Sequence, residues 1–286
     1  MDKHQNKRKQ HVRLITQIGY TAITNGNLAG FFSGRIYTGD TKKICVPGLN
    51  CYSCPGALGA CPIGSLQAVE GSSFRVSFYI VGLLIVFGAI FGRFICGWLC
   101  PFGLVQDLLH KIPTGKKFKK LPGDRVLSCI KYGILAVLVV LLPSTIRSAF
   151  GIATPWFCKL VCPSGTLMGG IPLLLTNTSL RGAAGGLFWW KLGLLLFLLV
   201  VALFVWRPFC RYLCPLGAIY GFFNPVAAIR YRIDTEKCTQ CGACQRACKM
   251  NICTYQKPNS MECVRCGECK NACPQQAILI AGKKIK

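Results

Sequence analysis

Apolar residues are gathered into four long stretches along the chain of 286 residues, and basic or polar segments separate them. A transmembrane helix needs roughly 20 mostly apolar residues, and its backbone must form its hydrogen bonds within the helix. We therefore predict about four spanning helices, over Leu14–Gly34, Val76–Gly92, Val126–Ile146 and Gly182–Trp206.

These four stretches differ in polarity. The first is uncharged but contains several polar residues, such as Gln17 and Asn25, so it either spans against other helices or lies along the membrane surface. The third contains one lysine, Lys131, whose side chain can reach the interface from near a helix end. The fourth contains Trp189 and Trp190, which are typical interface anchors. We favour spanning for all four.

The pattern changes after residue 228, where a polar, cysteine-rich tail begins. We predict two domains on this basis. Residues 1–228 form an integral membrane, all-α domain, and residues 229–286 form a small α+β domain of the bacterial ferredoxin type.

Composition agrees with a membrane protein, because 52% of the residues are hydrophobic, the mean hydropathy is +0.44 and only 15% are charged. A formal net charge of +25 would also suit nucleic-acid binding. Membrane topology and anionic clusters explain that charge better, so we expect no nucleic-acid partner. Residues 1–13 are basic, but a polar segment follows them, which predicts no cleavable signal peptide.

Lysines and arginines are concentrated in three segments: before the first stretch, between the second and third, and after the fourth. The two other connecting segments contain fewer. Cytoplasmic segments of membrane proteins are enriched in these residues. Provided that the first helix spans, both termini and the tail are therefore predicted to be cytoplasmic, in a multi-pass protein of a bacterial cell membrane.

Eight tail cysteines follow the spacing that holds two iron–sulfur clusters, Cys-x2-Cys-x2-Cys-x3-Cys repeated twice. In this pattern three cysteines of each run ligate one cluster and the fourth ligates the other. The predicted ligand sets are Cys238, Cys241, Cys244 and Cys273 for one [4Fe–4S] cluster, and Cys263, Cys266, Cys269 and Cys248 for the other. Cys248 is followed by Lys249 instead of proline, and Cys253 is close enough in sequence to take its place. Zinc sites or disulfides seldom produce two runs this compact.

A second motif, Cys-Pro-x-Gly-x-apolar, occurs four times before the tail, beginning at Cys61, Cys100, Cys162 and Cys214. Three copies have another cysteine four residues earlier, and the first copy has Ala57 there. Proline suits the first helical position, which makes the cysteine an N-cap, and a helix N-terminus stabilises the thiolates of an anionic cluster. The alternative is that each Cys-Pro only ends one helix and begins another, with sulfur as an apolar filler.

The predicted topology divides these cysteines into two groups. The inner group follows the second and fourth spans and predicts one [4Fe–4S] cluster at the cytoplasmic face: Cys96, Cys100, Cys210 and Cys214. The outer group, at the opposite face, predicts a fourth cluster held by Cys61, Cys158 and Cys162, with either Cys54 or Cys51 as the fourth sulfur. The alternative for these five cysteines together with Cys45 is disulfides. Cys129, alone in the third span, is predicted to be a buried apolar residue.

Several cofactors are excluded by what the sequence contains. Its only histidines are His4, His11 and His110, so no predicted span offers a histidine pair for haem. No G-x-G-x-x-G motif opens a helix after a strand, which argues against a dinucleotide site.

The chain resembles the NapH-like membrane polyferredoxins from about residue 14 onward. Two segments carry the likeness, Arg93-Phe-Ile-Cys-Gly-Trp-Leu-Cys-Pro-Phe-Gly and Arg207-Pro-Phe-Cys-Arg-Tyr-Leu-Cys-Pro-Leu-Gly. The segment from Val46 to Pro62 resembles a branch found in anaerobic bacteria. The resemblance implies membrane electron transfer, and members of the family are implicated in quinol oxidation for periplasmic nitrate reduction. Larger relatives carry a flavin-binding domain, for which this chain shows neither the length nor an attachment motif.

We expect a membrane protein that passes single electrons between a cytoplasmic ferredoxin, flavoprotein or reductase subunit and a quinone or exported acceptor. It would act as a component of an oxidoreductase such as a quinol dehydrogenase, and no catalytic residue can be assigned. One alternative is copper reduction or metallocentre assembly, which the four methionines and three histidines do not favour. The other is a membrane redox sensor.

Overall fold

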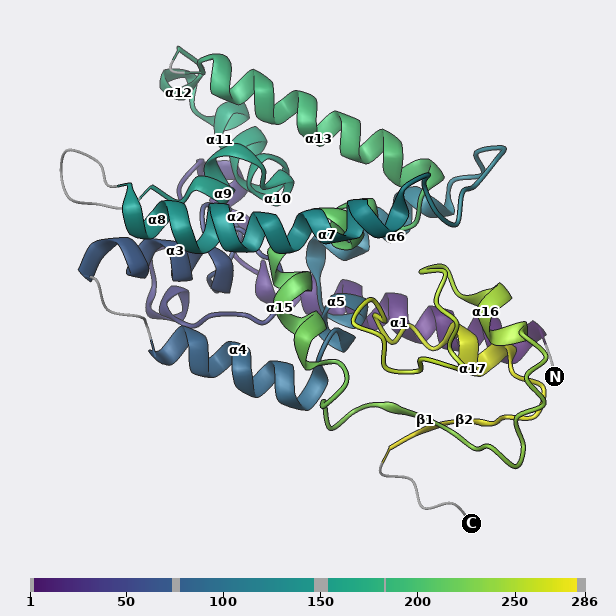
Figure 1. Ribbon diagram of the computed structural model, residues 1–286. Helices are drawn as coiled ribbons and strands as arrows, with labels where there is room; N and C mark the ends of the chain where they lie inside the picture. The colour runs from purple at the N-terminus through teal and green to yellow at the C-terminus, as the bar shows by residue number, and fades with distance from the viewer. Residues whose placement is uncertain (1–2, 74–77, 147–153, 183, 282–286) are drawn as a thin grey trace.

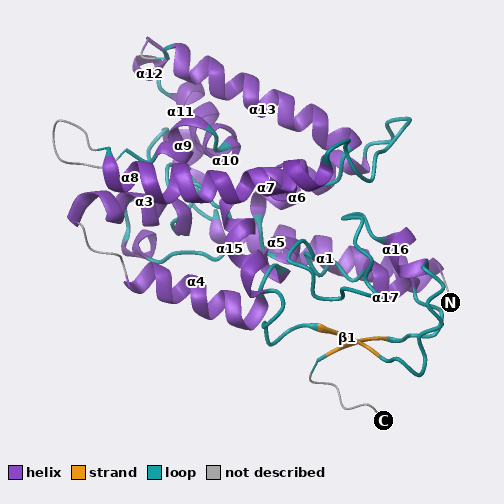
Figure 2. Ribbon diagram, in the orientation of Figure 1, coloured by secondary structure: helices purple, strands orange, loops and turns teal. Residues whose placement is uncertain are grey.

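The computed structural model describes residues 3–73, 78–146, 154–182 and 184–281, and these are mostly helical (Figure 1). Two strands occur near the C-terminus (Figure 2). The elements are α1 Lys3–Thr24, α2 Leu28–Ser33, a short 3₁₀ turn Asp40–Lys43, α3 Pro62–Ser73, α4 Phe78–Phe91, α5 Phe94–Trp98, α6 Pro101–Lys111, α7 Asp124–Ile134, a π-helical segment Leu135–Leu141, α8 Leu142–Thr145, α9 Trp156–Leu160, α10 Pro163–Gly165, a second π-helical segment Thr166–Gly170, α11 Ile171–Thr176, α12 Thr178–Gly182, α13 Gly186–Phe204, α14 Pro208–Tyr212, α15 Pro215–Phe223, β1 Tyr231–Ile233, α16 Ala243–Ala247, α17 Glu268–Ala272 and β2 Ile278–Ile280.

Two helices among the described residues are long and apolar enough to cross a membrane. One runs from Asp124 to Thr145 through α7, the π-helical segment and α8, and the other is α13. Only 17% of each apolar window is buried inside the protein. A core helix of a soluble protein would be mostly covered, so these two helices present unusually apolar surfaces. Both coincide with the predicted third and fourth spans.

The second predicted span forms only in a shorter version. Helix α4 has 14 residues, fewer than the roughly 20 that a perpendicular span needs. The beginning of the predicted segment, residues 76–77, lies outside the described residues. Helix α4 is nevertheless very apolar, and Phe78 and Tyr79 at its start are exposed.

The first predicted span does not form one continuous helix. Helix α1 begins at Lys3, before the apolar stretch, and ends at Thr24. The chain then turns through Asn25, Gly26 and Asn27, and α2 follows. The side-chain amide of Asn25 donates to the Thr21 carbonyl, and that of Asn27 donates to the Pro55 carbonyl. The Asn25 bond is local, whereas the Asn27 bond reaches a carbonyl 28 residues later in the chain. Asparagine side chains that bind backbone groups favour turns over helix, and an apolar count does not register such contacts.

Two predictions for the third span were wrong. Lys131 does not extend to an interface: its side chain is fully buried and pairs with Glu262 of the tail. Cys129 is exposed instead of buried. Successive helical residues are rotated by about 100°, so positions two apart lie on nearly opposite faces. The face of α7 that carries Lys131 packs inward, and Cys129 therefore points outward.

The helix starts predicted at the Cys-Pro motifs are confirmed in all four copies. Helices α3, α6, α10 and α15 each begin at the proline of the motif. Cys100, Cys162 and Cys214 are the N-caps of the last three, with extended backbone. Short five-residue helices, α5, α9 and α14, lie just before those three motifs. The motif thus turns the chain sharply and leaves each sulfur at the start of a new helix.

The tail is a small ferredoxin-like region in which β1 and β2 pair antiparallel, with Arg232 opposite Leu279. Helices α16 and α17 pack against each other beside this ribbon. Each begins after a glycine with positive φ, Gly242 or Gly267, a conformation that glycine adopts without strain. The α+β character predicted for the tail is confirmed.

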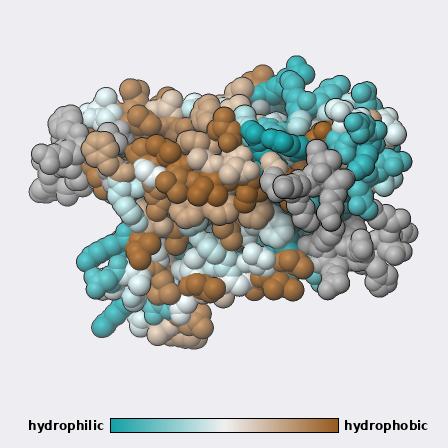
Figure 3. Space-filling view, turned by 90° about the horizontal axis from the view of Figure 1, so that it is seen from below, coloured by the Kyte–Doolittle hydropathy of each residue, from teal (hydrophilic) through white to brown (hydrophobic). Residues whose placement is uncertain are grey.

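Polar and apolar surfaces separate along the length of the molecule. In Figure 3 the tail end is largely hydrophilic, whereas brown hydrophobic residues cover much of the helical part. The start of α1 lies at the tail end of the molecule in Figure 1. Helix α1 leads from there along α5 and α6 toward the loop that contains Cys51 and Cys54.

Candidate iron–sulfur sites

All twenty cysteines lie in the described part of the chain, and all are free thiols. Among the described residues no three His, Cys, Asp or Glu side chains are close enough together to hold a single metal ion. Cysteine sulfurs that surround a four-iron cluster are separated by the cluster itself, so a wider arrangement around a cavity is what such a site requires.

The distal tail site consists of Cys238, Cys241, Cys244 and Cys273. All four line one cavity, which Tyr255 and Ile278 help to close. Cys273 follows α17 and therefore reaches this cavity from the second cysteine run. The structure thus brings together the four cysteines that the spacing in the sequence assigns to one cluster.

The proximal tail site consists of Cys263, Cys266, Cys269 and Cys248. Burial, reinforced by the neighbouring sulfurs of Cys266, Cys263 and Cys248, raises the pKa of Cys269. Cys253 is located elsewhere, beside Tyr255 and in a surface cavity that includes Lys257 and Glu262. Cys248, and not Cys253, accordingly lies with the other three cysteines.

The inner site consists of Cys96, Cys100, Cys210 and Cys214, which are all buried in the main core. Cys96 lies on α5, Cys210 lies on α14, and the other two cap α6 and α15. The amide of Gln106 donates to Cys210 Sγ at 3.2 Å, and the backbone N–H of Gly217 donates to Cys214 Sγ at 3.4 Å. Donors therefore point at the sulfurs from helices α6 and α15.

Two fully buried arginines connect the halves of the inner site. Arg93, before α5, donates to the Cys210 carbonyl at 2.9 Å, and Arg207, before α14, donates to the Cys96 carbonyl. Burial raises the pKa of Cys96 and of Cys210 to about 11, although both guanidinium groups act in the opposite direction. The arginines thus offset part of the cost of placing anionic sulfur in a buried site.

Each arginine is held by a carboxylate. Asp107 accepts from Arg207 Nε at 2.8 Å and also pairs with Arg13 of α1 at 3.2 Å. Glu262 of the tail accepts from Arg93 Nη1 at 2.8 Å and pairs with Lys131. Both guanidinium groups are fully buried, whereas Glu262 is partly exposed. The pairs fix the orientation of the arginines, because removing either carboxylate would leave a buried charge without its partner.

The inner residues fit an anionic cluster. Arg93 Nε is buried and has no hydrogen-bond partner among the described residues, although the sulfurs of Cys96 and Cys210 are near its guanidinium. A buried donor without an acceptor costs about 1–3 kcal/mol. Hydrogen-bond donors and cations surround the four thiols, and this surrounding matches the negative charge of a [4Fe–4S] cluster.

The tail is docked directly on the inner site. Trp98 Nε1 donates to the Arg265 carbonyl at 3.1 Å, and Asn224 Nδ2 donates to the Cys263 carbonyl at 2.8 Å. A side-chain Cβ on Gly97 would clash with the Val264 carbonyl oxygen, so the two backbones are in close approach. Gly97 adjoins Cys96, and Val264 adjoins Cys263. The proximal tail site and the inner site are therefore neighbours.

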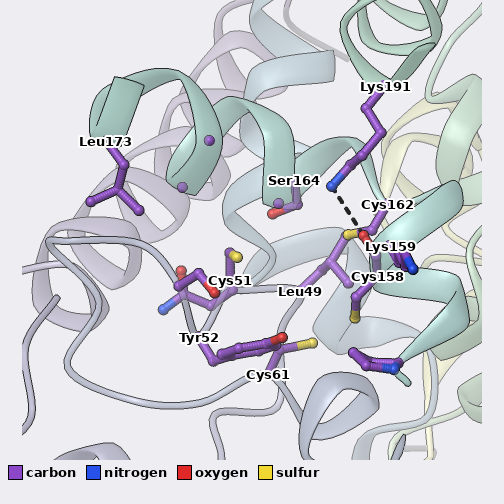
Figure 4. A pocket seen from close by; sticks show the side chains of 16 residues that line it. Leu49, Cys51, Tyr52, Cys61, Cys158, Lys159, Cys162, Ser164, Leu173 and Lys191 are labelled. Atoms are coloured by element: carbon purple, nitrogen blue, oxygen red, sulfur yellow. Dashed lines mark hydrogen bonds between the residues drawn. The ribbon is translucent and has the colours of Figure 1, made fainter. Parts of the chain in front are cut away.

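The outer cysteines do not all share one location. Cys51, Cys61, Cys158 and Cys162 line a cavity of about 350 Å³ together with Lys191, and Figure 4 shows their sulfurs turned toward the same space. Cys54 lies outside that cavity, fully buried, with its sulfur 3.7 Å from Asn25 Oδ1. We name the four lining cysteines the outer site.

A short loop connects the inner and outer sites. Burial raises the pKa of Cys100, and a hydrogen bond from the backbone N–H of Leu49 opposes that shift. Tyr220 Oη also donates to the Pro47 carbonyl at 3.0 Å. Cys51 follows Leu49 by two residues, which span at most roughly 7 Å of extended chain. The two sites are therefore much closer than the roughly 30 Å thickness of a hydrocarbon core.

Comparison with known proteins identifies the family. A family described as "4Fe-4S binding domain" matches residues 76–121 and 187–233, which contain the inner cysteines. A second family with the same description matches residues 231–254 and 257–279 of the tail. The ferredoxin-type protein NapH of Haemophilus influenzae is 29% identical over 172 residues, which are 58% of this chain and 51% of NapH. The chain belongs to the NapH-like 4Fe-4S polyferredoxins.

Other relatives agree with this assignment. An uncharacterised protein of Methanocaldococcus jannaschii is 33% identical over 184 residues, which are 63% of this chain and 68% of that protein. A methylamine utilization ferredoxin-type protein, MauN, of Paracoccus denitrificans is 27% identical over 231 residues, 79% of this chain and 70% of MauN. The chain spans about half to two thirds of the length of the first curated relatives that it matches. No solved structure matches it.

Sequence reasoning identified the cysteines of this polyferredoxin but missed the residues that surround them. Arg93 and Arg207 occupy the third position before Cys96 and Cys210, and Gln67 and Gln106 occupy the sixth position after Cys61 and Cys100. Both regularities are visible in the sequence once the Cys-Pro copies are aligned. Asp107 and Glu262 carry no comparable signal, because only the fold places them against the arginines.

Proposed function

We propose that this polyferredoxin is an integral membrane protein that passes single electrons between a cytoplasmic redox protein and a membrane quinone or exported acceptor. The observation that carries the proposal is the direct dock of the proximal tail site onto the inner site, through Trp98, Asn224 and the Gly97–Val264 approach. A bound [4Fe–4S] cluster supplies one-electron oxidation and reduction.

Membrane insertion is supported by the exposed apolar helices. Asp124–Thr145 and α13 have the length and hydropathy of spans, and exposed Trp189 and Trp190 lie near the start of α13, where interface anchors occur. Helix α4 is short, and a thinner bilayer around it or a partner helix would compensate. We propose that the polar tail and both ends of the chain lie on the cytoplasmic side, as the distribution of lysines and arginines predicts.

In this proposal the protein's own residues position the redox groups and adjust their energies. Eight tail cysteines hold two clusters in the distal and proximal sites, and four inner cysteines hold a third. Arg93 and Arg207 supply positive charge beside the inner thiolates, and Gln106 supplies a hydrogen bond to Cys210 Sγ. Such charges and donors favour the more negative, reduced form of a cluster and raise its reduction potential.

The donor or acceptor at the tail would be a ferredoxin, flavoprotein or reductase subunit. The basic segment with Lys116, Lys117 and Lys120 lies close to the tail, since Lys119 donates to the Arg246 carbonyl at 2.7 Å. An exposed basic face steers acidic redox carriers toward it, although the positive-inside rule alone also accounts for these lysines.

The proposal is tested with the complete protein, purified without oxygen and reconstituted in liposomes that contain a menaquinone analogue. A reduced acidic ferredoxin, which cannot cross the bilayer, is added outside as donor. We expect ferredoxin oxidation coupled to quinone reduction in liposomes whose tails face outward. Cys210→Ser should lose one cluster and reduce the rate to that of protein-free liposomes, while both tail clusters remain in the EPR spectrum.

Cys129→Ala is the matched control, because Cys129 is exposed and belongs to none of the proposed ligand sets. It should transfer electrons at the wild-type rate. If the donor reduces the tail clusters of the wild-type protein but the quinone stays oxidised, the proposed transfer is wrong, and redox-dependent binding of a partner becomes the better explanation.

A further inference from the structure

The outer site repeats a glutamine contact of the inner site. Gln106 donates to Cys210 Sγ at 3.2 Å and accepts from the Phe209 backbone N–H at 3.1 Å. Gln67 donates to Cys158 Sγ at 3.6 Å and accepts from the Phe157 backbone N–H at 3.0 Å. Each glutamine lies six residues after a Cys-Pro cysteine, and each contacts the first cysteine of the facing Cys-x3-Cys-Pro motif and the phenylalanine before it.

The two sites also share a pattern of cations on backbone carbonyls. In the inner site, Arg93 binds the Cys210 carbonyl and Arg207 binds the Cys96 carbonyl, four residues before Cys214 and Cys100 respectively. In the outer site, Lys191 donates to the carbonyl of Cys158, four residues before Cys162, at 3.1 Å.

The remaining outer carbonyl completes the pattern. Lys42 donates to the carbonyl of Ala57, four residues before Cys61, at 2.8 Å. All four carbonyls at this position therefore bind a lysine or arginine, although the four cations come from different parts of the chain. Two positive charges adjoin each site.

The outer site differs from the inner site at one motif position: Ala57 lies four residues before Cys61, where both inner motifs have a cysteine. The outer motifs therefore supply only three cysteines. Cys51 supplies a fourth, because its sulfur points into the same cavity as those of Cys61, Cys158 and Cys162 (Figure 4). Cys54 points instead toward Asn25 of the α1–α2 turn.

The four distal tail cysteines, which have cluster spacing in the sequence, line one cavity. The outer site has the same arrangement, and the larger of the two cavities. Neither 4Fe-4S family match includes any of its four cysteines, since the matches cover residues 76–121, 187–233, 231–254 and 257–279.

We propose that Cys51, Cys61, Cys158 and Cys162 ligate a further [4Fe–4S] cluster, and that Cys54 is not a ligand. Lys42 and Lys191 are positioning residues: each binds a backbone carbonyl in one half of the site, and both offset its negative charge. The inference deepens the proposed function, because it gives electrons from the inner site a redox group on the far side of the 47–51 loop.

Cys51→Ser and Cys54→Ser form the matched pair that tests it, because the two cysteines share a loop and differ in where their sulfurs point. Iron and acid-labile sulfide are measured per chain on the complete protein purified without oxygen, alongside EPR of the reduced sample. Four clusters give about sixteen iron atoms. We expect about sixteen for the wild type and Cys54→Ser, and about twelve for Cys51→Ser with the tail and inner signals intact.

About twelve iron atoms in the wild type, or a cluster lost from Cys54→Ser and kept in Cys51→Ser, would overturn the inference. If Cys51→Ser does not fold, Gln67→Leu replaces it: that variant should shift the potential of one EPR signal that Gln106→Leu leaves unchanged. If Gln67→Leu shifts no signal in this way, the result counts against the proposed outer cluster. Quinone reduction by the reconstituted protein is a separate readout, so failure of the outer site and failure of the proposed function are distinguishable.

Discussion

At the scale of single residues, the buried sulfurs are surrounded by groups that donate hydrogen bonds or carry positive charge. Gln106 is itself buried, and its amide is oriented by the Phe209 backbone N–H, which leaves its two hydrogens directed at Cys210 Sγ and the Phe102 carbonyl. Reduction adds negative charge to a cluster, so a donor at a ligand sulfur stabilises the reduced form more than the oxidised form. In the proposed inner cluster this glutamine would therefore raise the reduction potential.

We expect Gln106→Leu to keep the inner cluster and lower its reduction potential. A neutral hydrogen bond contributes about 1 kcal/mol, which for a one-electron couple corresponds to roughly 40 mV. An anaerobic EPR titration of the complete protein measures the shift. Gln67→Leu is the control of equal chemistry at the other site and should leave the inner potential where it was. An unchanged potential in Gln106→Leu would show that the amide has no effect on this cluster.

At the scale of elements, the starts of helices were more predictable than their faces. Cys-Pro fixed the first residues of α3, α6, α10 and α15 because proline at the first helical position needs no backbone partner. Which side of a helix is buried depends on distant partners. Lys131 is buried only because Glu262, 131 residues later, lies opposite it, and an apolar stretch gives no sign of that contact.

The break in the first apolar stretch has the same origin. Asn25 and Asn27 were visible as polar residues, but the carbonyl of Pro55 that holds Asn27 comes from another part of the chain. The tail cysteine sets were predictable from their local spacing, and the inner set was predictable because the predicted spans bring two distant Cys-x3-Cys-Pro motifs to the same face. The choice between Cys51 and Cys54 was not, since it depends on how the loop folds over the cavity.

Helix α7 offers a matched pair of substitutions on its two faces. Lys131→Met should weaken the docking of the tail by roughly 1–3 kcal/mol, because Glu262 loses one of two buried cations and keeps Arg93. Cys129→Ala, two residues away on the exposed face, should change stability by less than about 0.5 kcal/mol. Thermal unfolding followed through the visible absorbance of the clusters compares both variants with the wild type. Equal stabilities would mean that the Lys131–Glu262 pair does not hold the tail.

At the scale of the whole molecule, the sites form a series in which each adjoins the next. The distal and proximal tail sites exchange cysteines between their two runs, the proximal site adjoins the inner site across Gly97 and Val264, and the 47–51 loop leads to the outer site. Neighbouring sites in a fixed arrangement suit electron transfer, because its rate depends on separation and not on motion. The arrangement depends most on the tail dock, since no covalent linkage other than the main chain holds the tail there.

We expect Gly97→Val to separate the tail from the inner site without removing a cluster. A side chain at this position would clash with the Val264 carbonyl, which is backbone and cannot rotate away, so the tail must shift. Freeze-quench EPR after mixing with reduced ferredoxin should then show tail clusters reduced at the wild-type rate and the inner cluster reduced more slowly. Gly82→Val in α4 is the control, because a side chain there meets no atom within 4 Å. If both variants reduce the inner cluster as fast as the wild type, electrons do not enter it through this contact, and the order of sites argued from the dock is wrong.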